Sequence, residues 1–328
     1  MVEALWITEA EVADAVDLNE ATDAVRDVLG RQDDATATAL EKTAAAWGHG
    51  HTLHALGGID VGAGLVGTKT WAHTDGGAMP LLVLWDAETG ALRAVVEAFA
   101  LGQLRTASVS AVATDVLAPV GASTLAMIGT GKQALAQIAA VLSRRPIEEV
   151  RIFSPTPEHR AALAVRLAGQ APWVRITDCA TVAAAVDGAD VVTTATRASA
   201  AVLAAEDLDG PVHVNAVGAI TPERRELAPS AVAAAAIVVS DSPAAARQLS
   251  CELDDVDEVV ALAHVVAAGR PRPHGLTLFK AMGLGLADLA VGAAVLRCVV
   301  DRGGGRPIPP PTNSSPTLFA GAPTEGRP

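Results

Sequence analysis

Residues 124–134 contain a glycine turn whose spacing could hold a dinucleotide. An apolar, strand-like run (Leu-Ala-Met-Ile) leads into the turn Gly-Thr-Gly-Lys-Gln-Ala, and an Ala/Leu/Ile-rich helix is expected to follow. Such a turn lets the backbone approach a pyrophosphate, and the helix N-terminus offers it free N–H groups. A tight turn without a ligand is the alternative, but the strand and helix on either side favour the cofactor. We therefore expect the phosphates at Gly129, Thr130, Gly131, Lys132 and Gln133.

The end of the next expected strand, at Phe153, bears on which dinucleotide binds. An Asp or Glu at this point usually binds the ribose 2′-hydroxyl of NAD. Here the sequence continues Ser-Pro-Thr, and Ser154 and Thr156 could hydrogen-bond a 2′-phosphate, with charge from His159 or Arg160. Alternatively, these residues only cap the following helix. Because a carboxylate would repel the phosphate and none is present, we favour NADP and keep NAD as the alternative.

Two cationic side chains in apolar surroundings could bind a carboxylate. Lys69 lies on a strand expected over 66–71, and Arg105 begins a helix-like run of small residues. A lysine in a semi-apolar pocket can pair with a carboxylate, or donate a proton if burial lowers its pKa. A guanidinium can bind a carboxylate through two parallel hydrogen bonds. The alternatives are a lysine that extends into solvent and a surface salt bridge.

The histidines around residues 48–54 resemble a metal cluster only superficially. His49 and His51 would point to the same side of a strand, but no Cys or carboxylate stands at ligand spacing. We therefore expect a glycine-rich, exposed hairpin and no metal site. His54 or His73 could still line a substrate pocket as a proton donor.

The residues after 120 alternate between expected strands and helices, which predicts a doubly wound parallel α/β sheet. Helices are expected at Lys132–Leu142, Pro157–Ala168 and Val182–Val186. The strand candidates are Leu125–Ile128, Val150–Phe153, Val174–Ile176, Val191–Ala195, Val212–Ala216 and Ile237–Val239.

The flanking segments predict a second α/β unit. A short strand at Trp6-Ile7 is followed by a capping box that begins at Thr8. A Gly- and Ala-rich helix, Lys280–Val300, should close the ordered chain, and residues 303–328 are expected to be a flexible tail. Further elements are expected as helices at Asn19–Arg31 and Ala98–Leu117 and as strands at Leu65–Trp71 and Leu81–Trp85.

Composition excludes several classes of protein. The 328 residues suffice for two domains, and a net charge of −13 argues against nucleic-acid binding. No apolar run of about 18–20 residues is present, so no membrane span is expected. The first residues lack the basic region of a signal peptide. The widely spaced Cys179, Cys251 and Cys298 fit a reducing cytoplasm rather than a disulfide framework.

An ordered set of motifs resembles the ornithine cyclodeaminase/mu-crystallin family. The resemblance implies a Rossmann domain (120–275) inserted in a substrate-binding and dimerisation domain (1–119 plus 276–302), and hence a homodimer. It also implies a nicotinamide cofactor and chemistry at carbon–nitrogen bonds. The motifs are Gly67-Thr68-Lys69, Arg105-Thr106-Ala107-Ser108, the glycine turn, Val214-Asn215-Ala216-Val217-Gly218-Ala219, Val239-Ser240-Asp241-Ser242 and Thr277 to Gly283 with Asp288.

The same resemblance implies roles for individual residues. Lys69 and Arg105 would hold the substrate carboxylate, and Lys42 would take the place of a family arginine. Lys280 would help with the carboxylate or neutralise an acid, whereas Asp288 is expected to be structural. The cofactor would contact Thr106, Val217 and Gly218.

One departure from the family pattern bears on the reaction. In ornithine cyclodeaminases an Asp serves the substrate amine at the position of Ile220, which cannot accept a proton. Glu223 could replace it, although helix capping explains Glu223 equally well. We therefore expect an NAD(P)H-dependent reductase of the C=N bond of an imino acid, or equivalently an amino-acid dehydrogenase, with Lys69 or a water as proton donor. The alternatives are a cyclodeaminase-like lyase that uses NAD catalytically and a non-catalytic small-molecule binder of the mu-crystallin type.

Overall fold

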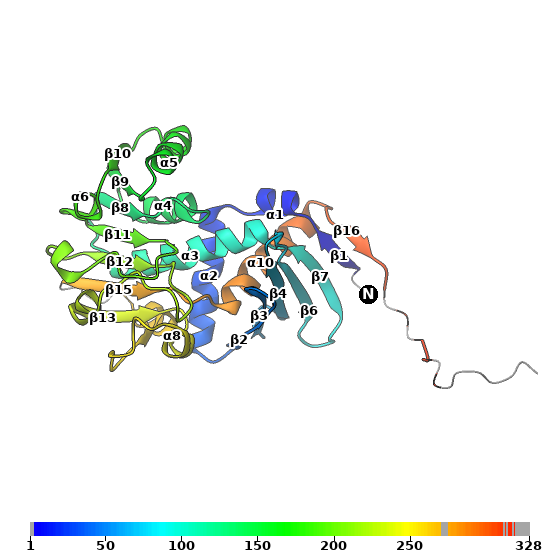
Figure 1. Cartoon of the computed structure of the whole chain (residues 1–328). Helices are drawn as coiled ribbons and strands as arrows, with labels where there is room; N and C mark the ends of the chain where they lie inside the picture. The colour runs from blue at the N-terminus through cyan, green and yellow to red at the C-terminus, as the bar shows by residue number, and fades with distance from the viewer. Residues whose placement is uncertain (1–2, 270–274, 311, 313, 317, 319–328) are drawn as a thin grey trace, which may run out of the picture.

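The chain forms two β-sheets, each with helices packed against it, and long helices lie between the two sheets (Figure 1). The computed structural model describes residues 3–269, 275–310, 312, 314–316 and 318. None of the described helices is long and apolar enough to cross a membrane.

The second sheet is parallel throughout and confirms the expected Rossmann architecture. Its helices lie on both faces of the sheet. In spatial order, the strands are β10 (Arg175–Cys179), β9 (Glu149–Phe153), β8 (Thr124–Ile128), β11 (Val191–Thr194), β12 (His213–Ala216), β15 (Leu276–Lys280), β13 (Ala235–Ser240) and β14 (Val260–Ala261). The helices are α4 (Ala134–Leu142), α5 (Pro157–Gln170), α6 (Val182–Val186), the short η1 (Ala205–Asp207), α7 (Pro229–Ala233), α8 (Pro243–Leu249) and α9 (Leu262–Ala268). The three helices that were expected here agree with the observed α4, α5 and α6 to within two residues at each end.

Strand β15 corrects the expected end of this domain. Residues 276–280 are hydrogen-bonded between β12 and β13, so Lys280 ends a strand instead of beginning a helix. Gly283, with φ +95°, lies in the break that follows, and the helix begins only at Gly285. The two-domain division stays a prediction, but the chain returns to the first sheet after Lys280 and not near Leu276.

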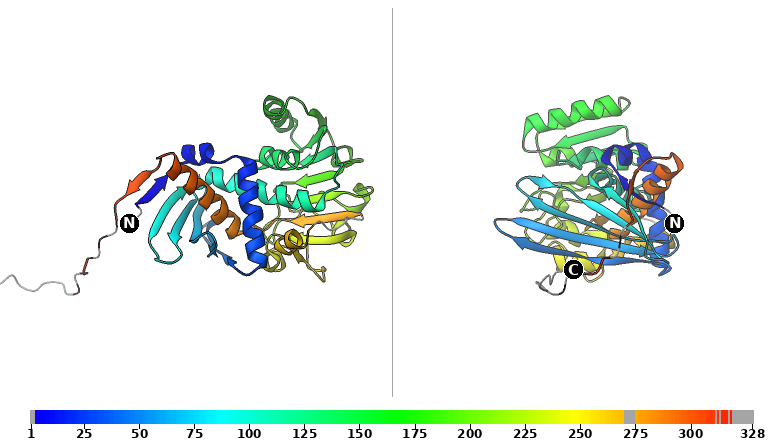
Figure 2. Two further views of the ribbon diagram at one scale, coloured as in Figure 1. Left: turned by 180° about the vertical axis from the view of Figure 1, so that it is seen from behind. Right: turned by 90° about the vertical axis from the view of Figure 1, so that its right-hand side faces the viewer.

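The first sheet is mostly antiparallel, and helices cover one of its faces. Helix α10 (Gly285–Asp301) packs along this face, and α2 (Leu18–Asp33) and α3 (Phe99–Leu117) lie between α10 and the second sheet, whereas α1 (Glu9–Ala15) lies at the end of the first sheet (Figures 1 and 2). Thr8 and Glu11 form the expected capping box of α1. The strands are β16 (Arg306–Ile308), β1 (Ala4–Ile7), β7 (Leu92–Glu97), β6 (Leu81–Asp86), β4 (Leu65–Thr74), β3 (His51–Asp60) and β2 (Ala37–Trp47), with the short β5 (Gly77–Ala78) beside β4.

Part of the expected flexible tail is structured. Residues 306–308 form β16, which pairs antiparallel with β1 at the edge of the first sheet. The backbone N–H of Gly305 also donates to the carboxylate of Glu11, at 2.7 Å. Much of the remaining tail, from residue 311 onward, lies outside the described residues.

Helix α10 approaches the first sheet so closely that only glycine fits at the contact. A Cβ on Gly285 would lie 2.2 Å from the backbone oxygen of Gly57 on β3. A Cβ on Gly292, two turns later, would lie 2.3 Å from the Leu82 side chain. This contact sets how far the side chains of α10 reach toward the sheet.

We therefore expect Gly285→Ala to lower the free energy of unfolding by about 2–3 kcal/mol, because the helix and β3 must separate. Gly30→Ala in α2 is the matched control: its Cβ meets no atom within 4 Å, and the change should stabilise the helix by about 0.5–1 kcal/mol. Urea denaturation followed by circular dichroism measures both. Equal midpoints for Gly285→Ala and the wild type would contradict the close contact.

Candidate active site

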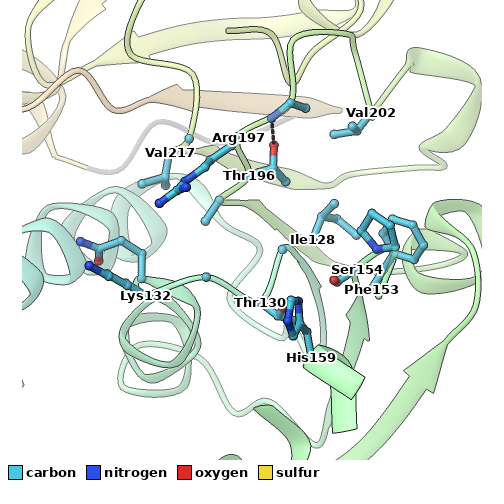
Figure 3. Close-up of a pocket in the computed structure, with 17 residues that line it drawn as sticks. Ile128, Thr130, Lys132, Phe153, Ser154, His159, Thr196, Arg197, Val202 and Val217 are labelled. Atoms are coloured by element: carbon cyan, nitrogen blue, oxygen red, sulfur yellow. Dashed lines mark hydrogen bonds between the residues drawn. The ribbon is translucent and has the colours of Figure 1, made fainter. Parts of the chain in front are cut away.

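The larger cavity, of about 790 Å³, opens at the carboxyl ends of the central strands of the parallel sheet. The strand order reverses there, with β9 on one side of β8 and β11 on the other, and ligands of doubly wound sheets bind at such switch points. The wall includes all of the residues predicted for the phosphates, together with Val217 and Gly218 (Figure 3).

The glycine turn fits a bound pyrophosphate. Gly129 has φ +112°, and a Cβ there would lie 2.5 Å from the backbone oxygen of Ala195, so a side chain is excluded. At Gly131 a Cβ would meet nothing within 4 Å, which leaves its backbone open toward the cavity. Helix α4 begins at Ala134 and directs its N-terminus at this turn. The residues present therefore fit the phosphates of a dinucleotide.

The charges on this wall also suit an anion. Lys132, His159 and Arg197 line the cavity, whereas no Asp or Glu does among the described residues. Arg197, which was not predicted from the sequence, follows β11 and extends across the cavity on the side of Val217 (Figure 3). The polar run Thr-Arg-Ala-Ser after a buried strand was the available signal.

The predicted 2′-phosphate site is only partly assembled. Ser154 and His159 lie on the cavity wall, but Thr156 and Arg160 do not. The Arg160 guanidinium is 9% exposed, donates to the backbone oxygen of Ser154 at 2.7 Å and pairs with Asp178. Direct cofactor contact by Arg160 was therefore a wrong prediction, because this side chain is used to hold the Ser154 backbone.

A second, smaller cavity of about 200 Å³ adjoins the first. Gln133 and Val217 line both cavities, so they mark the boundary between them. The remaining wall of the second cavity comes from β2, β3, β4, α3 and the loops after β12, β13 and β15. It consists of Lys42, Leu56, Trp71, Arg105, Thr106, Val109, Ile220, Asp241, Ala281, Met282 and Gly283.

Two of the predicted cations meet one buried carboxylate at this cavity. Asp288, on α10, is completely buried, and its Oδ1 lies 2.5 Å from Lys69 Nζ and 3.2 Å from Arg105 Nε. The carboxylate is thus shared by α10, β4 and α3. Arg105 lines the cavity, whereas Lys69 does not; the Lys69 ammonium lies over the ring of Trp71, 5.3 Å from its centroid.

The surroundings of Lys69 favour loss of its proton. Only 3% of Lys69 is exposed, and this burial together with the charge of Arg105 lowers its pKa to about 8. Asp288 opposes the shift by attracting the ammonium. A lysine with such a pKa can donate a proton at neutral pH and recover it from water.

Lys42 gives the cavity a second available cation. A register shift in the β2–β3 pair between Leu40 and Thr43 places Lys42 in a bulge, and its side chain lines the cavity. Burial and the charge of Arg105 lower its pKa. No acidic group among the described residues lies within ion-pair distance of Lys42.

Neither predicted histidine lines the cavity. His54 stacks on Trp71, with ring centroids 4.8 Å apart, and its Nε2 is bonded to the Thr52 hydroxyl. Burial and the nearby Lys42 lower the pKa of His54. His73 is exposed on β4. Within the described residues, no three His, Cys, Asp or Glu side chains gather closely enough to hold a metal ion.

Asp241 is a cavity residue that sequence analysis did not single out as functional. It accepts the backbone N–H groups of Met282 and Gly283 at 2.7 and 2.9 Å, and burial raises its pKa. Gly283 in turn lies against the Arg105 guanidinium. Asp241 therefore shapes the loop on which Arg105 packs.

Lys280 does not reach either cavity. Its ammonium is completely buried and paired with Glu252, so the prediction that it binds substrate was wrong and the alternative, neutralisation of an acid, holds. Glu252 accepts the backbone N–H groups of Glu226 and Leu227 at 2.6 and 2.7 Å. The Lys280–Glu252 pair therefore holds the loop that ends at Leu227 and does not bind the substrate.

The buried Glu226, also missed, joins the two loops that border the cofactor cavity. Its carboxylate accepts the backbone N–H groups of Thr196 at 2.6 Å and of Gly218 at 2.7 Å. On the same loop Ile220 lines the second cavity, as an apolar wall. Glu223 is exposed and lines neither of the two cavities, so this geometry lends no support to a role as a replacement base.

Comparison with known proteins agrees with this geometry. Residues 67–303 match the model of the ornithine cyclodeaminase/mu-crystallin family. An iminosuccinate reductase of Paracoccus denitrificans is 30% identical over 91% of this chain and 98% of that protein, and a Delta(1)-pyrroline-2-carboxylate reductase of Bacillus cereus is 34% identical over 70% and 73%. The solved structure of the Paracoccus enzyme in complex with NAD⁺ has a TM-score of 0.85 at 28% identity, covering 93% of this chain and 98% of that one. The chain therefore belongs to the ornithine cyclodeaminase/mu-crystallin family.

Proposed function

We propose that this protein is an NAD(P)H-dependent oxidoreductase that reduces the C=N bond of an imino acid. The observation that carries the proposal is the junction of the two cavities at Gln133 and Val217. One cavity suits a dinucleotide, and the other presents cations to a carboxylate. The iminosuccinate and pyrroline-2-carboxylate reductases among the relatives support the same reaction class.

The cations of the second cavity bind and orient the substrate. Arg105 and Lys42 take the α-carboxylate, because both line the cavity and Lys42 has no acidic partner among the described residues. Asp288 pairs with Arg105 on the side of its Nε, by charge and without a hydrogen bond, which leaves the terminal nitrogens for the substrate. The bound cofactor supplies a hydride to the imine carbon.

Lys69 supplies the proton that the imine nitrogen needs. Its ammonium lies over the Trp71 ring and pairs with the same Asp288 as Arg105, and its pKa of about 8 suits proton donation. The proton passes to nitrogen through one water, because Lys69 does not itself line the cavity. The small volume of the cavity, about 200 Å³, favours compact substrates.

A cyclodeaminase reaction is less well supported by this site. It needs a group that handles the substrate amine, yet Ile220 presents only an apolar surface and Glu223 is exposed. A purely binding role leaves unexplained why the cations adjoin a dinucleotide-sized cavity. Reduction of an imine, in contrast, uses both the dinucleotide-sized cavity and the cations that adjoin it.

We further propose NADP as the preferred cofactor. Ser154 and His159 line the cavity where the adenosine ribose binds in this fold, and no carboxylate lines it among the described residues. We expect the enzyme in the cytoplasm, where reducing conditions suit its three free cysteines.

We also propose a homodimer formed through the first sheet. Side chains alternate along its strands, and on β6 Leu82 and Leu84 are buried on the side of α10. The residues that alternate with them therefore face away from α10. This uncovered face is largely apolar, as expected of an interface between permanent partners. It includes Leu40, Ile59, Val66, Leu81, Val83, Trp85 and Val95.

The pH dependence tests Lys69. The donor must be protonated, so kcat/KM for imine reduction should fall as the pH rises through about 8. Lys69→Met should lower kcat/KM by at least about 100-fold and remove this alkaline limb. Lys69→Arg keeps the charge beside Asp288 but cannot release a proton, so kcat should fall while KM changes little. An unchanged alkaline limb in Lys69→Met would exclude Lys69 as the donor.

Cofactor choice depends on Ser154. Ser154→Asp should raise the dissociation constant of NADPH by at least about tenfold through repulsion of the 2′-phosphate, while that of NADH changes little. Thr156→Asp is the control, because Thr156 does not line the cavity. Fluorescence titration measures each constant. Equal effects of Ser154→Asp on both cofactors would contradict a 2′-phosphate at this position.

The dimer is tested at the centre of the uncovered sheet face. Val83→Glu should convert a particle of twice the chain mass of 33.2 kDa into a monomer, because a charge would be buried without a partner. Val165→Glu, at a residue 74% exposed on α5, serves as the control and should leave the mass unchanged. Light scattering after size exclusion gives both masses. A monomeric wild type would refute the proposal.

A further inference from the structure

Gln133 occupies a position that its role in the glycine turn does not explain. It is the N-cap residue of α4, but its side chain makes no capping hydrogen bond. Together with Val217 it lines both cavities. A group that extends from the phosphates in the first cavity to the substrate in the second must pass this residue.

The amide of Gln133 is also unpaired. Its Oε1 is buried and has no hydrogen-bond partner among the described residues. A buried acceptor left in this state is unfavourable relative to a paired one. Because Oε1 is buried, a ligand in the cavities can reach this acceptor only after the terminal torsion of the side chain turns.

We propose that the Gln133 amide binds the carboxamide of the nicotinamide ring and so holds the ring at the boundary of the two cavities. The inference rests on the proposed function, since it requires a nicotinamide dinucleotide. The carboxamide has one donor group and one acceptor, which match the two ends of the glutamine amide. A half-turn of the terminal torsion exchanges those ends within nearly the same volume and brings Oε1 to the cavity side.

The neutral charge of Gln133 suits this place. The nicotinamide ring is positively charged when oxidised and neutral when reduced, so an uncharged amide favours neither form strongly. The neighbouring Lys132 is suited to the phosphates instead. Gln133 is thus assigned to the ring and not to the pyrophosphate.

Two ligands that differ only in the nicotinamide ring separate these roles. We compare the dissociation constants of NADPH and of 2′-phospho-ADP-ribose, which lacks the ring, by calorimetry. Gln133→Leu should weaken NADPH about tenfold and leave 2′-phospho-ADP-ribose unchanged. If the wild type prefers NADH, the same comparison uses NADH and ADP-ribose.

The matched control is Gln137→Leu, one turn later on α4. Both polar atoms of the Gln137 amide are buried without partners, as in the tested residue, but Gln137 lines neither cavity. It should leave both dissociation constants unchanged. Circular dichroism melting shows whether each variant is folded.

A second variant keeps the inference testable if Gln133→Leu does not fold. Gln133→Glu places a negative charge beside the ring, so affinity for NADP⁺ relative to NADPH should increase about fivefold or more. The assignment would be overturned if Gln133→Leu weakened the binding of NADPH and 2′-phospho-ADP-ribose equally or weakened neither. It would also be overturned if Gln133→Glu left the ratio of the NADP⁺ and NADPH dissociation constants unchanged. Failure of the wild type to bind either ligand would instead refute the proposed function.

Discussion

The site depends on one buried carboxylate, that of Asp288. It is completely buried beneath the first sheet and attracts Lys69 from β4 and Arg105 from α3. Loss of one partner from such a cluster leaves an uncompensated charge in the interior, which is strongly destabilising. Three elements distant in sequence are therefore held in one arrangement. The glycines that let α10 lie against β3 bring Asp288 within reach.

A second set of buried acids organises the cofactor side. Glu226 holds the backbones of Thr196 and Gly218, and Glu252 with Lys280 holds the backbone of Glu226 itself. Carboxylates that accept several backbone N–H groups are well compensated for their burial. The loops held in this way border both cavities, so the walls of the two cavities keep a constant relation.

Local patterns in the sequence were sufficient to predict the parallel sheet and its glycine turn. Each βα unit has an apolar strand, a turn and an amphipathic helix within a short stretch, so periodicity reveals it. Strand β15 was missed because Leu-Thr-Leu-Phe-Lys runs directly into a Gly/Ala-rich segment, and local propensity does not show that β12 and β13 leave a gap for it. The bulge that turns Lys42 into the cavity likewise depends on pairing between β2 and β3.

By itself, the sequence determined the fold class and the family, and it predicted the glycine turn and the cations Lys69 and Arg105 as site residues. Only the tertiary structure decided which charged groups are available for ligands. Lys280 and Arg160 resemble binding residues in the sequence. In the structure, however, Lys280 is paired with Glu252, and Arg160 donates to the backbone oxygen of Ser154. Asp241 and Arg197 came into view for the opposite reason, since folding leaves them on the cavity walls. Such pairings join distant residues, and their energies depend on burial that no local pattern records.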